Sequence, residues 1–312
     1  MSFEAPLIDL WNKVQDIEHD PVFAKELEDL RAALYKKTLA LYEDLRPIQK
    51  VEIARHPNRP HSISYITNLF TDFFSISGDR TYGEDRAIIC GFANFRKSRV
   101  IVISQEKGDT NESRKLHNYG CPMPEGYRKA IRAMEIANEL QVPIISFVDT
   151  PGAYPGPAAE ERGQGYALAD CLATLSKVQV PVISIIIGEG GSGGAIAIAA
   201  ANKVLMLQNA MYSVITPEGC ASILWQAKDK KGEAAEAQKL TAQDLYRFQI
   251  IDEIIKEPLG GAHRDPDATI ATVGDVLESY LNEYKNKSHY PMFKDERVNR
   301  YKKMGERIQV IR

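Results

Sequence analysis

The stretch Val180–Ala201, VPVISIIIGEGGSGGAIAIAAA, decides the fold of this chain. Residues 182–187 are apolar and mostly β-branched, which is typical of a strand buried on both faces inside a parallel or mixed α/β sheet. Small apolar residues at 195–201 predict a helix packed into the core. Between them lie five glycines, Gly188, Gly190, Gly191, Gly193 and Gly194. We therefore expect a strand, a glycine-rich loop and a buried helix in succession.

A glycine-rich loop that opens a helix offers unpaired N–H groups at the positive end of the helix dipole, a site for a phosphate or for a developing oxyanion. A P-loop would need Lys where Ala195 stands. The spacing of Gly188, Gly190 and Gly193 fits the dinucleotide fingerprint, but Gln208 stands where an acidic residue is expected. We favour an oxyanion site. Glycines that merely permit close helix–strand packing are the alternative.

The composition is that of a soluble globular protein, with 312 residues, 44% hydrophobic and 26% charged. Such a length allows one large domain or two ordinary ones. The net charge of −3 argues against binding to nucleic acid or to an anionic membrane. The N-terminus MSFEAPLIDL lacks the features of a signal peptide, and no apolar run is long enough to span a bilayer. We expect a cytoplasmic protein.

The cysteines predict neither a disulfide framework nor a zinc site. All four of them, Cys90, Cys121, Cys171 and Cys220, are far apart and form no C-x-x-C pair. His117 and Cys121 have a spacing that suits a metal on a helix, but Pro122 interrupts such a helix and further ligands are missing. We expect no metal in this chain.

Three regions follow from the pattern along the chain. Residues 1–60 form a helical N-terminal extension and linker, because apolar residues recur at helical spacing over 7–17 and 23–34 and RHPNRP at 55–60 is rich in turns. The two apolar stripes must bury against the main domain or a partner subunit. Residues 61–285 form the main domain. Residues 286–312 are a basic C-terminal segment, expected to be a solvated or subunit-contacting helix.

The main domain alternates strands and helices. Residues 87–95 and 99–106 predict a hairpin. Further strands are expected at 143–148, 182–187, 203–207, 211–215 and 250–255, and helices at 124–140, at 158–177, after Pro217 and after Thr241. A loop follows a buried strand at DTPG (149–152) and again at GEGGSGG (188–194). Ligands bind at the carboxyl ends of such strands. We expect the two loops to face each other across one cleft, with Gly152, Ala153, Gly190 and Gly191 contributing to substrate binding.

Several long motifs together resemble one family. They are SFVDTPGAYPG (146–156), EERGQG (160–165), IGEGGSGGA (187–195), YSVITPEGCASILW (212–225) and EPLGGAHRDP (257–266), and the similarity extends back to ARHPNRP at 54–60. This combination is similar to the alpha subunits of the bacterial acetyl-CoA carboxylase carboxyltransferase. The resemblance implies an α/β fold of the crotonase/ClpP type, a ββα spiral with a helical N-terminal extension.

The resemblance also implies a reaction and partners. Members of the family transfer a carboxyl group from carboxybiotin, borne by a biotin carboxyl carrier protein, to acetyl-CoA, and the malonyl-CoA formed serves fatty acid biosynthesis. They act with a beta subunit of the same fold that carries a four-cysteine zinc finger, in an assembly of two alpha and two beta subunits. An ATP-using biotin carboxylase completes the system. The absence of a zinc-finger spacing here fits an alpha subunit.

The family's site residues carry over to this sequence at one motif. In the alpha subunits, the amides of SGG hold the ureido oxygen of biotin, which places Gly193 and Gly194 as the oxyanion donors. The beta subunit's own glycine pair holds the thioester enolate. Both stages are anionic, so they need fixed dipoles more than a side-chain base.

Other residues have competing interpretations. Ser192 as a nucleophile would need a histidine held by an acid, and the six histidines fall in loops or tails, so a tight turn is favoured. Asp149 is expected to cap the turn after it, and Arg162 and Lys107 to form ordinary surface ion pairs. Tyr154 and Trp225 could line the cleft or belong to the core.

Three other functions stay open. The chain could be a carboxyltransferase for another acyl-CoA. It could also be an acyl-CoA hydratase or isomerase, which would need acidic side chains in the cleft, for which Glu160 and Glu161 are the candidates. A chain without catalytic activity that only assembles carboxylase subunits is the third possibility.

Overall fold

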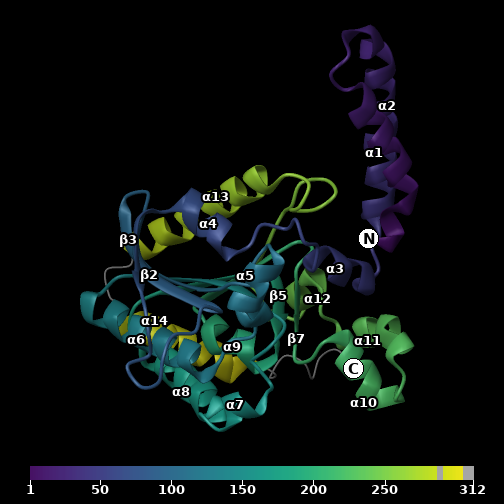
Figure 1. Cartoon of the computed structure of the whole chain (residues 1–312). Coiled ribbons are helices and arrows are strands. Elements are labelled where there is room, and N and C mark those ends of the chain that lie inside the picture. The colour runs from purple at the N-terminus through teal and green to yellow at the C-terminus, as the bar shows by residue number, and fades with distance from the viewer. Residues whose placement is uncertain (287–290, 305–312) are drawn as a thin grey trace.

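One eight-stranded sheet organises the computed structural model, which describes residues 1–286 and 291–304 (Figure 1). The strand order is β1-β2-β3-β4-β5-β6-β8, and β7 pairs with the far end of β5. The strands are β1 (Thr71–Ile76), β2 (Ile88–Phe95), β3 (Ser98–Gln105), β4 (Ile144–Thr150), β5 (Val182–Gly191), β6 (Lys203–Leu207), β7 (Met211–Ser213) and β8 (Glu253–Ile255).

The sheet is antiparallel at one edge and parallel elsewhere. β2 and β3 form the predicted hairpin, in which Phe95 lies opposite Ser98 and Arg96 takes the left-handed φ of 50° that a two-residue turn needs. From β3 onward neighbouring strands are parallel. The carboxyl ends of β3, β4, β5 and β6 therefore meet at one edge of the sheet, where ligand sites of α/β proteins lie.

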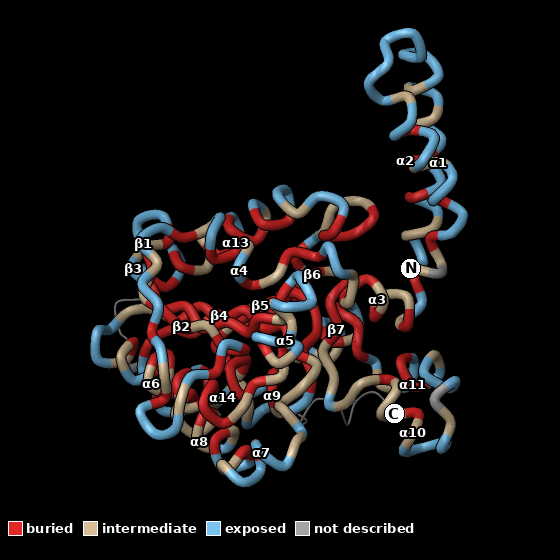
Figure 2. Tube along the Cα trace, in the orientation of Figure 1, coloured by how far each residue is buried: buried red, intermediate tan, exposed pale blue. Residues whose placement is uncertain are grey.

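Helices cover both faces of the sheet. One face carries α4 (Ser62–Leu69) and α13 (Pro266–Asn286), and the other carries α6 (Pro124–Leu140), α8 (Gln164–Lys177), α9 (Ser192–Ala199) and α14 (Pro291–Lys303) (Figure 1). Every residue of β4 and β5 is buried, which confirms the prediction of strands buried on both faces (Figure 2). The shorter helices are α3 (Pro47–Ala54), α5 (Asn111–Leu116), α7 (Pro157–Glu160), α10 (Pro217–Trp225), α11 (Lys231–Gln238) and α12 (Ala242–Arg247).

The N-terminal helices α1 (Ala5–Ile17) and α2 (Ala24–Glu43) form a hairpin that projects from the body (Figure 1). Leu7, Val14 and Leu34 form a separate apolar cluster between them. The stripes bury mainly against each other, and Trp11 also lies under the guanidinium of Arg264 of the main domain at 4.5 Å, while burial against a partner stays a prediction. The domain boundary at residue 60 stays a prediction.

The turn-rich segment 55–60 is anchored to the body and is not a free linker. Arg59 is only 3% exposed. Its guanidinium donates to the carbonyl of Ile187 at 2.6 Å and binds the carboxylate of Glu257 through two nitrogens at 3.0 and 2.6 Å. The segment thus attaches the N-terminal helices to β5 and to the loop after β8.

Three predicted elements are shorter or broken. The helix expected at 158–177 breaks into α7 and α8, because Gly163 takes a left-handed φ of 80°. The strand expected at 211–215 ends at Ser213, after which Thr216 caps α10 by accepting a hydrogen bond from Gly219. The strand expected at 250–255 begins only at Glu253, because the amides before it turn back to the carbonyl of Leu245 at the end of α12.

The basic C-terminal helix packs on the domain, so the expectation of a merely solvated helix was wrong, and its contact with another subunit stays a prediction. Arg297 of α14 is 1% exposed and donates to the carbonyl of Val180 at 3.3 Å and to Asn202 at 2.6 Å. Arg300 binds Asp252 at 2.6 Å. The rest of the predicted segment, 287–290 and 305–312, lies outside the described residues. Within the described part of the chain, no helix has the length and apolar character needed to cross a membrane.

Candidate functional site

The glycine segment, residues 188–194, is the end of β5 and the start of α9, so the expected loop between them was wrong. β5 continues through Gly191 because it pairs there with β7, where Gly190 lies opposite Tyr212. The chain changes direction at Ser192 alone, which is exposed and has a left-handed φ of 54°. The helix begins at that same residue.

Two of these glycines are required by close backbone neighbours, whereas Gly193 is not. A Cβ on Gly191 would lie 2.2 Å from the carbonyl oxygen of Pro151, and a Cβ on Gly194 would lie 2.5 Å from the amide nitrogen of Ala153. Gly193 has room, since the nearest atom to its Cβ would be a methyl of Leu168 at 3.7 Å. Packing therefore explains Gly191 and Gly194, whereas it leaves Gly193 without a structural reason.

The turn after β4, residues 151–156, packs directly against the start of α9. The two segments form one wall, and the cleft expected between them is not present there. The amide of Gly152, a predicted substrate-binding residue, already donates to the hydroxyl oxygen of Thr150 at 3.0 Å. Ala153 lies against Gly194, and Gly190 lies against Tyr212 instead. The structure thus brings Gly152, Ala153, Gly191 and Gly194 together and places Gly190 apart.

The N-terminus of α9 presents the donors of this wall. The first N–H groups of an α-helix have no acceptor within the helix, and in α9 these belong to Ser192, Gly193 and Gly194. The helix dipole adds a partial positive charge of about half an electron at the same point. This arrangement can stabilise an oxygen atom that carries negative charge.

Gln105, at the end of β3, holds the first turn of α9 in place through a hydrogen bond. Its side-chain amide donates to the carbonyl of Gly194 at 2.7 Å, and the residue is fully buried. Sequence analysis missed this contact. The available signal was a polar pair, Gln105 and Glu106, directly after the apolar strand.

Charged side chains gather beside this wall at the carboxyl ends of β3, β4 and β5. Lys107 binds Asp149 at 2.7 Å and Glu189 at 2.6 Å. Arg55 binds Glu189 at 2.7 Å and Glu218 at 2.9 Å. We call Arg55, Lys107, Asp149, Glu189 and Glu218 the ion cluster. Its Lys107 is largely buried, so the prediction of a surface ion pair for this residue was wrong.

One further prediction fails at the ion cluster. Asp149 does not cap the turn after it, because its Oδ1 accepts the backbone N–H of Glu189 at 2.8 Å. The histidines are not all remote from the site, since the Nδ1 of His61 lies 3.5 Å from Oδ2 of Asp149. That distance is too long for a strong hydrogen bond.

The ion cluster keeps its charges despite burial. Burial alone would raise the pKa of Asp149, but Lys107 and His61 lower it below the ordinary value. The pKa of Glu189 is lowered in the same way by Lys107 and Arg55. Burial alone would lower the pKa of Lys107, and the two carboxylates raise it. The cluster therefore consists of mutually compensating charges.

Ser192 lacks the partners of a nucleophile. A left-handed serine between a strand and a helix is the geometry of a nucleophile elbow. Among the described residues, however, no hydrogen bond joins Ser192 to a histidine. A serine without an adjacent base is a weak nucleophile. We assign Ser192 to the turn.

The remaining predicted residues lie outside the wall. Arg162 pairs with Glu125 and stacks over Tyr82, but the Glu125 side chain is only 3% exposed, so the prediction of a surface ion pair was wrong here too. Glu160 and Glu161 are exposed at the end of α7. Tyr154 is half-buried and Trp225 is 41% exposed, so neither is a plain core residue.

The predicted metal pair makes other contacts. His117 lies just after α5, where its Nδ1 is 2.7 Å from the carbonyl oxygen of Ser113. Cys121 follows a 3-10 turn. In the described residues no group of three or more His, Cys, Asp or Glu side chains is placed to hold a metal ion.

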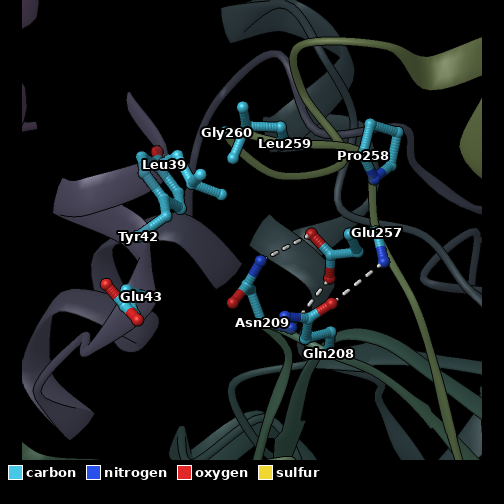
Figure 3. A pocket seen from close by; sticks show the side chains of 9 residues that line it. All are labelled: Leu39, Tyr42, Glu43, Gln208, Asn209, Glu257, Pro258, Leu259 and Gly260. Atoms are coloured by element: carbon cyan, nitrogen blue, oxygen red, sulfur yellow. Dashed lines mark hydrogen bonds between the residues drawn. The ribbon is translucent and has the colours of Figure 1, made fainter. Parts of the chain in front are cut away.

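Two cavities lie near this edge of the sheet. One of 200 Å³ is lined by Arg55, His61, Lys107 and Glu189 of the ion-cluster region, among others. Another of 370 Å³ lies between the end of α2 and the loop 257–260 (Figure 3). None of the predicted site residues lines the larger cavity.

Solved structures share the fold of this chain. The transcarboxylase 12S core, crystallised with methylmalonyl-CoA, matches with a TM-score of 0.58 at 19% identity over 75% of this chain and 44% of that chain. The beta subunit of geranyl-CoA carboxylase from P. aeruginosa gives 0.57 at 12% identity, over 81% of this chain and 46% of that chain. The fold is the crotonase-like α/β fold of the carboxyltransferases, as the sequence predicted.

The chain belongs to the family of acetyl-coenzyme A carboxylase carboxyl transferase alpha subunits. The model of the family described as "Acetyl co-enzyme A carboxylase carboxyltransferase-like" matches residues 1–305. An alpha subunit from Paramagnetospirillum magneticum is 50% identical over 288 residues, 91% of each chain. One from Rhizobium leguminosarum is 46% identical over 314 residues, 99% of each chain. The predicted family is confirmed, and the chain is a carboxyltransferase subunit of acetyl-CoA carboxylase, a multi-subunit enzyme.

Proposed function

We propose that the amides of Gly193 and Gly194 hold the ureido oxygen of biotin while a carboxyl group passes from carboxybiotin to acetyl-CoA, giving malonyl-CoA. The observation that carries this proposal is Gly193 at the N-terminus of α9, where a Cβ would meet nothing nearer than a methyl of Leu168 at 3.7 Å. Close packing explains why glycine stands at 191 and 194. It does not explain Gly193, where a Cβ would fit. A glycine without a packing reason, next to unpaired amides, fits a ligand that approaches the backbone closely.

The wall supplies fixed dipoles. Carboxybiotin, delivered on a carrier protein, would supply the carboxyl group. The amides of α9 stabilise negative charge on the ligand oxygen, and loss of one such donor typically costs about 10²–10³ in rate. Gln105 and the turn after β4 hold these amides in place before the reaction starts. Preorganised donors of this kind need no reorganisation during the reaction.

The same geometry argues against a hydratase. A hydratase needs acidic side chains at the reacting carbons, and the candidates Glu160 and Glu161 are exposed at the end of α7. The carboxylates near the wall, Asp149 and Glu189, are bound by cations and hold lowered pKa values. Carboxylates so compensated are poor proton carriers.

We further propose that a beta subunit with a zinc finger completes the site, in an assembly of two alpha and two beta subunits. The enolate of acetyl-CoA would be held on that partner. A biotin carboxyl carrier protein and a biotin carboxylase would complete the enzyme. The described residues of this chain offer one amide-rich wall, which suits one of the two anionic stages.

Reconstitution tests the proposal. Malonyl-CoA formation from carboxybiotin and acetyl-CoA is measured with this chain alone and with its candidate beta subunit. We expect activity only in the mixture, since the chain would contribute one of two oxyanion sites. Conversion of an enoyl-CoA by the chain alone would contradict the proposal and favour a hydratase.

A further inference from the structure

Lys107 joins three neighbouring strands at the edge of the sheet that carries the wall. It lies two residues after the end of β3, and its partners Asp149 and Glu189 lie near the ends of β4 and β5. Its ammonium is within 2.7 Å of both carboxylates. The lysine side chain is 14% exposed, and those of the two acids are 5% and 7% exposed. One buried cation thus bridges the two strands that lead into the wall.

This bridge is connected to the backbone of the glycine segment. Asp149 accepts the backbone N–H of Glu189. Its carboxylate also lies against Gly188, where an added Cβ would be 2.5 Å from Oδ1 of Asp149. Glu189 itself stands three residues before Ser192, where the chain enters α9. The positions of the two carboxylates therefore set the path of the backbone into the first turn of α9.

Removal of the lysine charge would leave this path without its support. Taking one partner out of a buried ion pair leaves an uncompensated charge. Without Lys107, Glu189 keeps Arg55, but Asp149 keeps the backbone N–H of Glu189 and His61 at 3.5 Å, and no close lysine or arginine pairs with it among the described residues. The two carboxylates would then repel each other or one of them would take up a proton, and neither state keeps the ammonium bridge between the strand ends.

The contacts of the ion cluster favour positioning over ligand binding. An anion would need free donors, but the lysine ammonium already serves two carboxylates and Arg55 serves Glu189 and Glu218. The cavity of 200 Å³ beside them opens to solvent and gives small molecules a route to the lysine. That route makes the role of the ammonium testable by replacement.

We propose that Lys107 is a positioning residue for carboxyl transfer, which holds the amides of α9 in their working place by bridging Asp149 and Glu189. The inference rests on the proposed function, because it concerns the same wall. Lys107 touches no substrate in this account. Its effect reaches the reaction through the strand ends, so its loss should change turnover while binding of acetyl-CoA on the partner is unaffected.

Lys129 provides a matched control. It is a lysine of α6 whose side chain is 3% exposed, and it binds Glu84 and the carbonyl of Asp85, remote from the glycine segment in the sequence and without contact to it. Lys107→Met and Lys129→Met both remove a buried ammonium. Each variant is assembled with the beta subunit, and its thermal unfolding, kcat and KM for acetyl-CoA are measured.

We expect Lys107→Met to lower kcat by about 10²-fold, as a displacement on the order of 1 Å does, with KM for acetyl-CoA unchanged. Lys129→Met should keep kcat within about threefold of the wild-type value. This holds even where its unfolding temperature falls further than that of Lys107→Met, because a loss of stability alone does not move the amides of α9. In Lys107→Ala, added propylammonium should restore turnover through the cavity, and the same amine should have no effect on Lys129→Ala.

The other possible outcomes count against either the positioning role of Lys107 or the proposed function. Equal kcat values for Lys107→Met and Lys129→Met, with an active wild-type assembly, would overturn the positioning role and leave the proposed function intact. An inactive wild-type assembly would instead count against the proposed function. If Lys107→Met fails to fold, Lys107→Met with Glu189→Gln removes one charge of each sign and is measured in its place. Wild-type kcat in that double variant would likewise overturn the inference.

Discussion

Replacing Gly194 by Ala is expected to lower the turnover of the assembled carboxyltransferase by about 10²-fold while the chain still folds. The added Cβ would lie 2.5 Å from the amide nitrogen of Ala153 and 2.7 Å from the carbonyl carbon of Gly152. Both are backbone atoms, so no side-chain rotation relieves the contact. Either α9 or the turn after β4 must move, and the donors move with it. Overpacking of this kind costs about 1–3 kcal/mol, which a folded domain of this size tolerates.

The measurement is kcat for malonyl-CoA formation, with size-exclusion chromatography to show that the complex assembles. Gly232→Ala in α11 is the control, because nothing lies within 4 Å of a Cβ at that position. A chain that only assembles other subunits would support the same turnover with either variant. Wild-type turnover in Gly194→Ala would therefore favour a chain that only assembles other subunits and has no catalytic role.

The second large effect concerns stability. Arg59→Met should reduce the free energy of unfolding by about 3–5 kcal/mol, because Glu257 would remain buried without its counter-charge. The two side chains are 2% and 0% exposed, and the guanidinium binds the carboxylate through two nitrogens. Figure 3 shows Glu257 beside Asn209, whose backbone and side-chain nitrogens bind the same carboxylate but carry no charge.

Urea unfolding followed by circular dichroism measures this effect. Arg31→Met removes the partner of Glu18 in an exposed pair, with side chains 54% and 40% exposed, and should cost less than about 1 kcal/mol. Combining Arg59→Met with Glu257→Gln should recover part of the loss, since the uncompensated charge is gone. Equal unfolding midpoints for Arg59→Met and Arg31→Met would contradict the account of this anchor.

Local patterns were enough to predict the framework of the fold. The β-branched run 182–187, the hairpin at 87–106 and the helix at 124–140 have strong periodic or compositional signals, and all three are present. The break at Gly163 was also visible in principle, because an isolated glycine within a helical pattern often marks an end. The path of β5 through its glycines was not visible, since it depends on pairing with Tyr212 of β7, more than twenty residues away.

The candidate site, like the fold, could be predicted only in part from the sequence. Gly193 and Gly194 could be named from a single motif, and their roles stay predictions. The ion cluster could not, because Arg55, Lys107, Asp149 and Glu189 each stand in a different part of the chain. A usable signal existed nonetheless: Lys107, Asp149 and Glu189 each follow or end an apolar run, and the carboxyl ends of parallel strands converge. Their mutual distances required the structure.

Gly193→Ala tests the central claim most directly, because it adds a methyl group to the wall without disturbing the packing. The Cβ would meet only Leu168 at 3.7 Å, and alanine is a better helix former than glycine, so stability should be equal or higher. Carboxyl transfer by the assembled enzyme should nevertheless fall by at least about tenfold, since a ligand oxygen could no longer approach the amides, a cost on the order of 1–3 kcal/mol. Gly232→Ala should keep wild-type turnover. Wild-type turnover in Gly193→Ala, with normal stability and assembly, would contradict the claim that biotin binds at the start of α9.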